Sequence, residues 1–246
     1  MQTTIAAIAT AQAPGGIGVI RISGPQAAEI AARVFHSRRG DIRDIPGYTA
    51  LFGWVEDQNG DKADEAIALR FRAPHSFTGE DVVELSCHGG LVILQQVLAA
   101  VLAAGAAPAG PGEFTRRAYC NGKMDLAEAE AVMQMISARG TQAARAALSG
   151  HDGALSRKIG ALRQELLLIA SHLAAWADYP DDDVPQITEG FLEKHLATVE
   201  NDLRRLLSTF DAGRVLREGV DTVIVGRPNA GKSTLKACSS GRCCCG

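Results

Sequence analysis

The sequence predicts a multidomain α+β protein with three parts: an α+β domain in residues 1–121, a helical bundle in 122–217 and the start of an α/β phosphate-binding domain in 218–246. Three observations predict these parts. The first part contains short β-rich runs separated by glycine and proline, and the second has apolar residues at alternating steps of four and three. The third contains a phosphate-binding loop motif directly after an apolar run. At 46% hydrophobic and 22% charged residues, the composition is typical of a folded globular protein.

The first part is expected to combine strands with one long apolar helix. The helix begins after Gly89 and is closed by Gly105 and Pro108. A hairpin loop is expected at 57–61, where Asp, Asn and Gly cluster between two β-type runs. The runs that predict strands are Ile17–Ile22, Leu51–Val55, Ala66–Phe71 and Val82–Leu85.

The second part is expected to be helical. Asp125 with Glu128 has the spacing of a capping box, which predicts a helix that begins there. Two long apolar patterns follow, over 155–176 and 192–210, and the two prolines and acidic turn of 179–185 separate them. Two such helices joined by a short break are expected to pair within one chain as part of a bundle. A dimeric coiled coil is the alternative.

The third part carries the most specific motif. Gly226, Gly231, Lys232 and Ser233 fit the phosphate-binding pattern G-x-x-x-x-G-K-[ST], and the run Val223–Val225 before them predicts a buried strand. Glycines let backbone N–H groups approach phosphates closely. Lys232 is then expected to contact the β- and γ-phosphates, and the Ser233 hydroxyl to ligate Mg²⁺. A P-loop ATPase would share these residues.

Charge and cysteine content restrict the remaining classes. A net charge of −3 gives no overall basic field, so a nucleic-acid partner requires a local patch or another subunit. The longest apolar stretch, 91–109, contains glutamine, glycine and proline and suits a buried helix better than a membrane span. The N-terminus lacks the basic region of a secretory signal, so a cytoplasmic protein is expected.

The last residues are unusually rich in cysteine. Metal binding is one interpretation, but no C-x-x-C pair with suitably spaced histidines is present, and adjacent cysteines cannot easily surround one tetrahedral ion. The tail also lacks the apolar periodicity of the amphipathic helix that should follow a phosphate-binding loop. We therefore favour an engineered end or an out-of-frame end over a metal site. The cysteines concerned are Cys238, Cys243, Cys244 and Cys245.

Six motifs in a fixed order, spanning Thr4 to Thr234, resemble the MnmE (TrmE) family of tRNA-modification GTPases. They lie at 15–24, 76–85, 88–90, 111–118, 121–130 and 216–219, and they read GGIGVIRISG, SFTGEDVVEL, HGG, PGEFTRRA, NGKMDLAEAE and LREG. The resemblance implies an N-terminal domain that dimerises and binds a formyl-tetrahydrofolate, then a helical domain into which a GTP-binding domain is inserted.

Carried over by motif, the residues that contact 5-formyl-tetrahydrofolate would be Arg21, Glu84 and Lys123. Their chemistry suits the ligand, because a carboxylate such as Glu84 can accept the paired donors of a pterin ring. The cationic Arg21 and Lys123 suit polar or anionic parts of the ligand.

The resemblance also implies a GTP site with Mg²⁺ on Ser233 and K⁺ on Asn229. The implied partners are a second copy of the chain, tRNA and an FAD-dependent MnmG-type protein, with no membrane. The implied reaction adds a carboxymethylaminomethyl-type group at C5 of the wobble uridine. The GTP-binding residues would be Asn229, Ala230, Gly231, Lys232, Ser233 and Thr234.

The chain departs from the family's pattern after the loop. Neither a D-x-x-G motif nor a guanine-reading N-K-x-D motif follows Ser233. We therefore expect that this chain by itself does not hydrolyse GTP, and no catalytic residue is assigned. The first hypothesis is an amino-terminal portion of an MnmE-type GTPase with an incomplete helical domain. The alternative is a standalone folate-binding or dimerisation module without GTPase activity.

Overall fold

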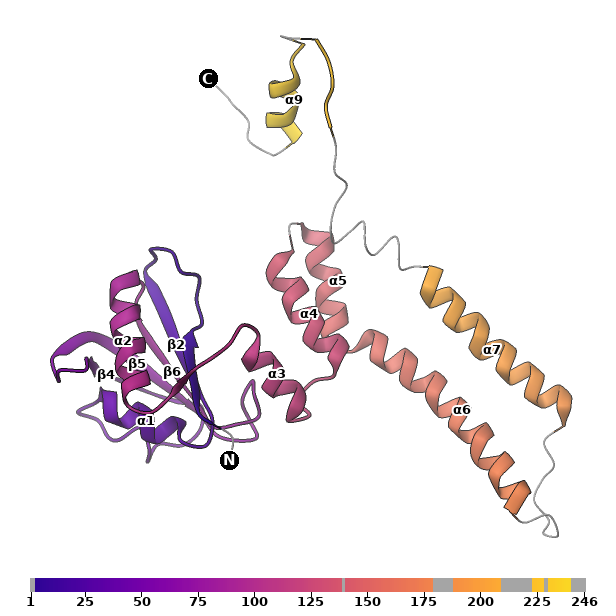
Figure 1. Cartoon of the computed structure of the whole chain (residues 1–246), viewed down its shortest axis with the longest axis horizontal. Coiled ribbons are helices and arrows are strands. Elements are labelled where there is room, and N and C mark those ends of the chain that lie inside the picture. The colour runs from indigo at the N-terminus through magenta and orange to yellow at the C-terminus, as the bar shows by residue number, and fades with distance from the viewer. Residues whose placement is uncertain (1–2, 139, 179–187, 209–222, 228–229, 240–246) are drawn as a thin grey trace. The chain divides into compact units, whose positions relative to one another are not determined.

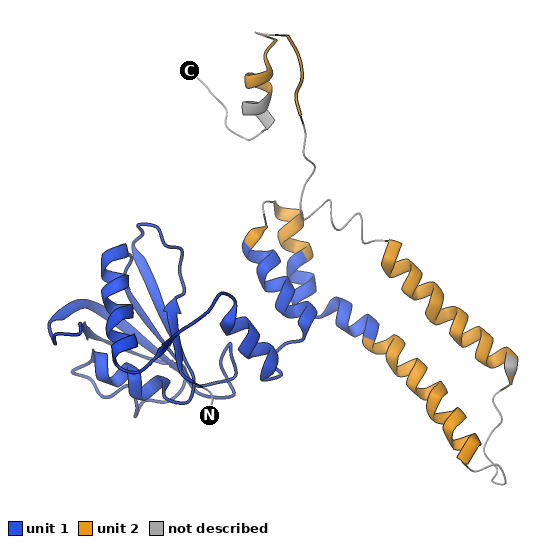
Figure 2. Ribbon diagram, in the orientation of Figure 1, with its two compact units in different colours: residues 1–136, 147–159 blue, residues 137–146, 160–246 orange. Residues whose placement is uncertain are grey.

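The computed structural model describes residues 3–138, 140–178, 188–208, 223–227 and 230–239 (Figure 1). The chain divides into two compact units (Figure 2). One contains residues 1–136 and 147–159, and the other contains residues 137–146 and 160–246. Each unit is described by itself below.

The first unit is built on a seven-stranded sheet with the strand order β3-β4-β5-β6-β2-β1-β7. Every pair of neighbouring strands is antiparallel except β1 and β7, which are parallel. The strands are β1 Ile5–Ile8, β2 Ile17–Ser23, β3 Phe35–His36, β4 Thr49–Glu56, β5 Lys62–Phe71, β6 Val82–His88 and β7 Ala107–Pro108.

Two helices cover one face of this sheet, α1 (Ala27–Val34) and α2 (Leu91–Ala103) (Figure 1). Between the helices and the sheet lies an apolar core that includes Ile20, Leu85 and Val97, all fully buried. Side chains alternate along a strand, so the neighbours of these residues point to the opposite face. Burial of the core side chains is the main force that holds the unit together.

Sequence patterns found the main elements of this unit. All four predicted strands and the long apolar helix are present, and the loop at 57–61 joins β4 to β5. Asp57 Oδ1 accepts hydrogen bonds from the backbone N–H groups of Asn59 and Asp61 at 2.8 and 3.0 Å, which keeps the pKa of Asp57 below its ordinary value. The strand β1 was missed because its two central alanines have low β propensity and its four residues are too few to show a period.

The helical region begins with the expected capping box. Asp125 Oδ1 accepts from Glu128 N at 2.9 Å, and Glu128 Oε2 accepts from Asp125 N at 2.8 Å. These two bonds satisfy backbone donors that the first helical turn leaves free. The helices of this region are α4 Leu126–Ser137, α5 Thr141–His151, α6 Ala154–Asp178 and α7 Glu189–Ser208.

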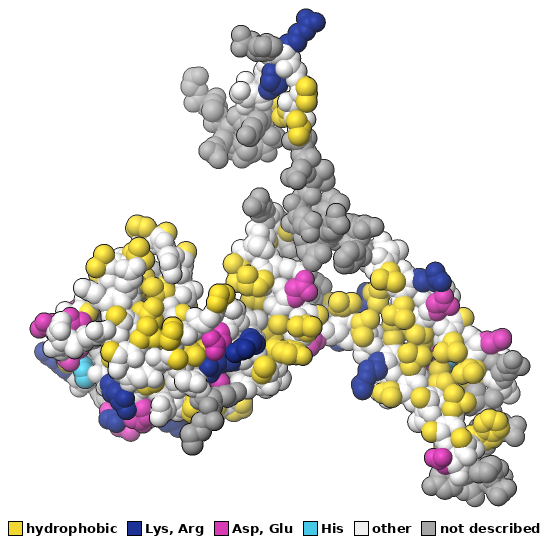
Figure 3. All heavy atoms as spheres, in the orientation of Figure 1, with side chains coloured by type: hydrophobic (Ala, Val, Ile, Leu, Met, Phe, Trp, Pro, Cys, Tyr) yellow, Lys and Arg dark blue, Asp and Glu magenta, His cyan; other side chains and the backbone are white. Residues whose placement is uncertain are grey.

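Helices α6 and α7 pair within the chain. Glu165 Oε1 and His195 Nδ1 lie 2.8 Å apart across the pair, and Ile169 and Val199 are buried. This agrees with a bundle rather than with a coiled coil between chains. The predicted break at 179–185 lies outside the described residues. Other apolar side chains of the two helices are exposed, Leu168 by 57% and Leu207 by 71%, and they form a broad surface (Figure 3).

One prediction for the third part is wrong. Residues Val223–Val225 are described, and they form no strand. A strand exists only when its N–H and C=O groups pair with a neighbour, and no described segment pairs with this one. Helix α9 (Lys232–Ser239) does follow the loop, although the tail's lack of apolar periodicity argued against it.

The described residues contain neither a membrane-spanning helix nor a metal-binding cluster. None of their helices combines the length and apolarity required to cross a bilayer. No group of three or more His, Cys, Asp or Glu side chains among them is arranged to hold a metal ion. The last three cysteines of the sequence lie outside the described ranges.

Candidate functional site

Arg21 and Glu84 meet at the centre of the sheet. They are direct partners in the register of β2 and β6, and both Arg21 Nε and Nη2 lie 2.7 Å from Glu84 Oε1. Their neighbours Ile20, Ile22 and Leu85 are fully buried against the helices, so the pair lies on the opposite face. The side chains retain 26% and 20% of their accessible surface. The ion pair is therefore available to a ligand.

Two phenyl rings border this ion pair. The Arg21 guanidinium carbon lies 5.4 Å from the ring centroid of Phe77 and 5.5 Å from that of Phe114. Both distances are within the range of a cation–π contact. Phe77 comes from the loop 72–81 between β5 and β6, and Phe114 from helix α3 (Glu113–Cys120). Sequence reasoning did not select either ring.

Lys123 contacts loop 72–81 from the segment that follows helix α3. Its Nζ donates to the carbonyl oxygen of Pro74 at 3.1 Å, and Asn121 Nδ2 donates to that of Thr78 at 2.7 Å. Gly79 has a φ of +76°, which favours glycine, and a Cβ there would lie only 3.1 Å from Lys123 Cγ. The structure thus joins Arg21 to Glu84 directly, whereas Lys123 contacts the loop that carries Phe77.

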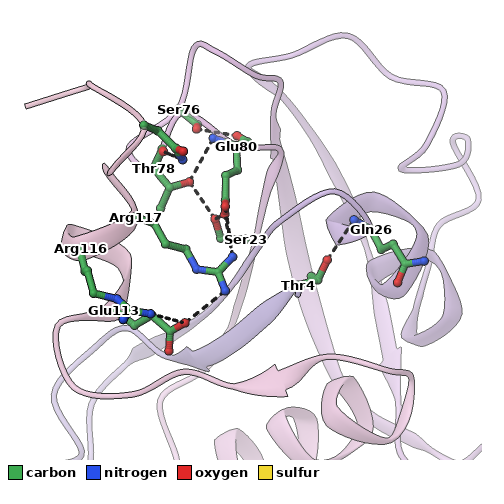
Figure 4. Close-up of polar contacts among 10 residues, drawn as sticks. Thr4, Ser23, Gln26, Ser76, Thr78, Glu80, Glu113, Arg116 and Arg117 are labelled. Carbon is green, nitrogen blue, oxygen red and sulfur yellow. Dashed lines mark hydrogen bonds and ion pairs between the residues drawn. The ribbon is translucent and has the colours of Figure 1, made fainter. Parts of the chain in front are cut away.

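A buried polar network connects loop 72–81 to helix α3 (Figure 4). Arg117 Nη1 donates to both carboxylate oxygens of Glu80, at 3.1 and 3.2 Å. Ser23 Oγ lies 2.7 Å from Thr78 Oγ1 and donates to Glu80 Oε2 at 2.7 Å. A buried carboxylate is tolerated only when it is paired and hydrogen-bonded, and here both conditions hold.

The network continues to Glu113 at the start of α3. Arg117 Nη2 donates to Glu113 Oε1 at 3.1 Å, and Arg116 Nη2 lies 3.7 Å from the same oxygen. The backbone N–H of Gly110 donates to Glu113 Oε2 and, with Arg117, keeps the pKa of this carboxyl below its ordinary value. The two segments that meet here are the motifs SFTGED and PGEFTRR. The available sequence signal was that one motif carries acidic residues and the other carries arginines. This signal did not reveal which residues pair.

A contact between a histidine and a carboxylate lies farther along β6. His88 Nδ1 is 2.6 Å from Asp64 Oδ1, and the His88 N–H donates to Asp64 Oδ2 at 2.7 Å. Burial alone would raise the pKa of Asp64, but the backbone and ring of His88 outweigh it and lower that pKa. The neighbouring Cys87 faces the core, where burial raises the pKa of its thiol to about 12, so it offers no thiolate.

A cavity lies beside loop 72–81. Its volume is about 980 Å³. Neither the Arg21–Glu84 pair nor Lys123 contributes to its lining, although Glu80 of the buried network does. The lining residues are Thr3, Thr4, Pro25, Gln26, Ala73, Gly79, Glu80, Asp81, Gly105 and Asn121.

The phosphate-binding loop forms a separate candidate site. Lys232 Nζ donates to the carbonyl oxygens of Gly226 and Arg227 at 2.8 and 2.6 Å, so the ammonium group lies over the loop. Gly231 has a φ of +76°, which favours glycine. A cavity of about 530 Å³ includes the backbone of the loop and the start of α9.

The remaining predicted residues of this site lie around the same turn. Ala230 precedes α9 and its N–H donates to Arg227 O at 3.3 Å, while Ser233 and Thr234 are exposed in the first turn of the helix. The oxygen chemistry of Ser233 at a helix start beside Lys232 fits a Mg²⁺–phosphate pair. Asn229, the predicted K⁺ ligand, lies outside the described residues.

Comparison with known proteins covers almost the whole chain. Residues 4–123 match the family model described as "GTP-binding protein TrmE N-terminus", and residues 126–237 match the "MnmE helical domain". Proteins named "tRNA modification GTPase MnmE" align with most of this chain. Those of Symbiobacterium thermophilum and Acetivibrio thermocellus are 46% and 42% identical over 235 residues, which is 95% of this chain and 51% of each relative.

A third relative of the same name agrees. The protein from Geobacillus thermodenitrificans is 46% identical over 235 residues, 94% of this chain and 51% of its own length. The family models follow each other in the order of the two regions seen in the fold. The chain therefore belongs to the MnmE (TrmE) family, and it spans about half the length of the curated relatives it matches.

Proposed function

We propose that this chain is the amino-terminal portion of a tRNA modification GTPase. The observation that carries the proposal is the match to relatives of that name across 95% of the chain, including the phosphate-binding loop. We assign residues 1–121 to folate binding and dimerisation, 122–217 to an incomplete helical domain and 218–246 to the start of a GTP-binding domain. The reaction is the addition of a carboxymethylaminomethyl-type group at C5 of a wobble uridine, together with an MnmG-type FAD protein.

The proposed one-carbon ligand, 5-formyl-tetrahydrofolate, binds at Arg21, Glu84 and Lys123. Arg21 directs both of its contacts to Glu84 Oε1. In the described part of the chain no hydrogen bond reaches Glu84 Oε2, so this oxygen is available to a ring N–H of the pterin. Lys123 is exposed and can turn from Pro74 toward an anionic part of the ligand.

The proposed nucleotide is GTP, bound from Asn229 to Thr234 with Mg²⁺ on Ser233 and K⁺ on Asn229. Lys232 would exchange its bonds to two loop carbonyls for contacts with phosphate oxygens. Because no D-x-x-G or N-K-x-D motif follows the loop in this sequence, turnover by this chain alone is expected to stay at background.

The proposed partners are a second copy of the chain, tRNA and the MnmG-type protein, in the cytoplasm. An apolar sheet face supports the homodimer. Ile17 is 70% exposed, Phe52 60% and Ile67 48%, and all three project from the face that α1 and α2 leave open. Exposed apolar surface of this kind is typical of a protein interface.

The folate assignment can be tested by calorimetric titration of the whole chain with 5-formyl-tetrahydrofolate. We expect saturable binding, weakened by about tenfold or more in Glu84→Gln and Arg21→Ala, because each loses a charge-assisted hydrogen bond. Arg116→Ala is the matched control, since Arg116 is 73% exposed and lies beside the network without joining Glu84. Absence of binding at high micromolar ligand would contradict the assignment.

A further inference from the structure

One buried ion pair joins the two segments that carry Phe77 and Phe114. Phe77 stands three residues before Glu80, and Phe114 stands three residues before Arg117, one turn earlier on α3. Glu80 and Arg117 bind each other through two contacts of 3.1 and 3.2 Å and are only 8% and 9% exposed. This bridge thus connects two ring-bearing segments that come from distant parts of the chain.

Both rings lie beside Arg21, the residue that pairs with Glu84. They contact the Arg21 guanidinium at 5.4 and 5.5 Å, and Arg21 in turn bonds to Glu84. Phe77 is 37% exposed. Its ring therefore stays accessible at a place where water would otherwise surround the charges of the ion pair. An aromatic ring at such a place can offer its face to a flat π-system and remain in contact with a cation.

We infer that Phe77 and Phe114 are specificity-determining residues that stack against the bicyclic ring of the folate, with the Glu80–Arg117 bridge as their positioning pair. The inference rests on the proposed folate function and extends it. Glu84 recognises the edge of the ring through hydrogen bonds, and the two phenyl groups recognise its faces. The bridge itself does not touch the ligand.

This division of roles has a physical reason. A hydrogen bond from a ring edge gains little net free energy in a half-exposed site, because water competes for the same carboxylate. Stacking on a phenyl group adds apolar contact that water does not replace, and it holds the ring in the plane that Glu84 needs. A ligand that lacks the bicyclic ring would gain neither contact.

The experiment titrates the full chain with two probes, 5-formyl-tetrahydrofolate and p-aminobenzoyl-glutamate, which lacks the bicyclic ring. Phe77→Leu and Phe114→Leu are each expected to weaken the binding of 5-formyl-tetrahydrofolate by about tenfold, in line with aromatic stacking energies. Both substitutions should leave the binding of p-aminobenzoyl-glutamate unchanged. Phe77→Tyr and Phe114→Tyr should restore binding to near that of the unsubstituted chain. Phe191→Leu removes a comparable ring from α7 and should have no effect.

The positioning pair is tested in the same titration. Arg117→Met removes the bridge and should reduce the preference for 5-formyl-tetrahydrofolate over p-aminobenzoyl-glutamate by about tenfold. Circular dichroism reports whether the variant retains its fold. Arg117→Lys keeps the charge and should recover part of the preference. A folded Arg117→Met variant with unchanged preference would overturn the positioning role.

The outcomes separate this inference from the function on which it rests. If the unsubstituted chain does not bind 5-formyl-tetrahydrofolate, the folate function fails and the inference fails with it. If the unsubstituted chain binds, but folded Phe77→Leu and Phe114→Leu variants bind equally well, only the stacking role is overturned. A loss that is the same for both probes would also overturn it, because a contact with the bicyclic ring cannot act on p-aminobenzoyl-glutamate, which lacks that ring.

Discussion

Glu80 and Glu84 lie on either side of the same strand start and have opposite surroundings. Glu80 is 8% exposed, and Ser23 and Arg117 occupy both of its oxygens. Glu84 keeps 20% of its side-chain surface and bonds to Arg21 through a single oxygen. The first carboxylate is fully committed to the fold, whereas the second still has an acceptor to offer. Environment, rather than residue type, separates the structural glutamate from the candidate binding one.

Glu113 gives a pH-dependent test at the same scale. Gly110 and Arg117 hydrogen-bond its carboxylate and lower its pKa from the ordinary 4.5. A carboxyl whose pKa is lower in the folded state stabilises the fold above the unfolded value, and this stabilisation is lost as the pH falls through the folded value. Glu113→Gln should therefore make the loss of stability on acidification shallower, as measured by urea unfolding midpoints at several pH values.

Removal of any one carboxylate could change how stability falls on acidification, even if that carboxylate had no specific partner. A control variant separates this general charge effect from the effect of the Glu113 hydrogen bonds. Glu193 is an exposed residue of α7, so Glu193→Gln removes an equal charge without touching the network. A Glu113→Gln profile that coincides with that of Glu193→Gln would show that the bonds from Gly110 and Arg117 do not contribute to acid stability.

At the scale of elements, the start of α4 is fixed by local chemistry. The capping box of Asp125 and Glu128 satisfies two backbone donors. The Ser156 hydroxyl, near the start of α6, adds a further bond to Asp125 and is the main reason that the pKa of this carboxyl is lowered. One side chain thus caps one helix and ties it to the beginning of another.

This cap can be tested by substitution. Asp125→Ala removes the acceptor and should lower the free energy of unfolding by about 1 kcal/mol, as for other N-cap residues. Asp125→Asn keeps an acceptor oxygen of the same geometry and should stay near the unsubstituted chain. Urea unfolding followed by helical circular dichroism measures both. Equal losses in the two variants would mean that charge, rather than the cap geometry, stabilises this helix start.

At the scale of the whole molecule, much apolar surface remains exposed within each unit. In the sheet unit, Phe52 and Ile67 are direct cross-strand partners on the open face, at 60% and 48% exposure. In the helical unit, α6 and α7 bury Ile169 and Val199 between them but leave other leucines in solvent. Surfaces of this type favour association with a further chain segment or a second copy.

The proposed homodimer places a second copy on the sheet face. Ile67→Arg should convert a dimer into a monomer in sedimentation velocity, because it introduces a charge that must be desolvated at the interface. Val92→Arg is the matched control, since Val92 is 67% exposed but lies on α2, on the other side of the sheet. A dimer that survives Ile67→Arg at the same protein concentration would exclude this face as the interface.

The sequence was most informative where the signal is local. Turn residues at 57–61, the spacing of Asp125 and Glu128, the bounded apolar run of α2 and the period of α6 and α7 all predicted the observed structure. Each of these signals depends on neighbours a few residues away. The strand at Val223–Val225 was wrongly predicted for the opposite reason. Its apolar residues favour a strand, but a strand forms only with a partner, and the described residues contain none.

For the candidate site, the sequence alone determined the family, the phosphate-binding loop and the choice of Arg21, Glu84 and Lys123. Only the tertiary structure decided that Arg21 pairs with Glu84, that two phenyl rings border this pair, and that Glu80 and Arg117 join the two segments that carry the rings. Motifs are read along the chain, whereas the Glu80–Arg117 and Arg21–Glu84 pairs join residues 37 and 63 positions apart. Their partners are set by sheet register and by the burial of charge, which no local pattern specifies.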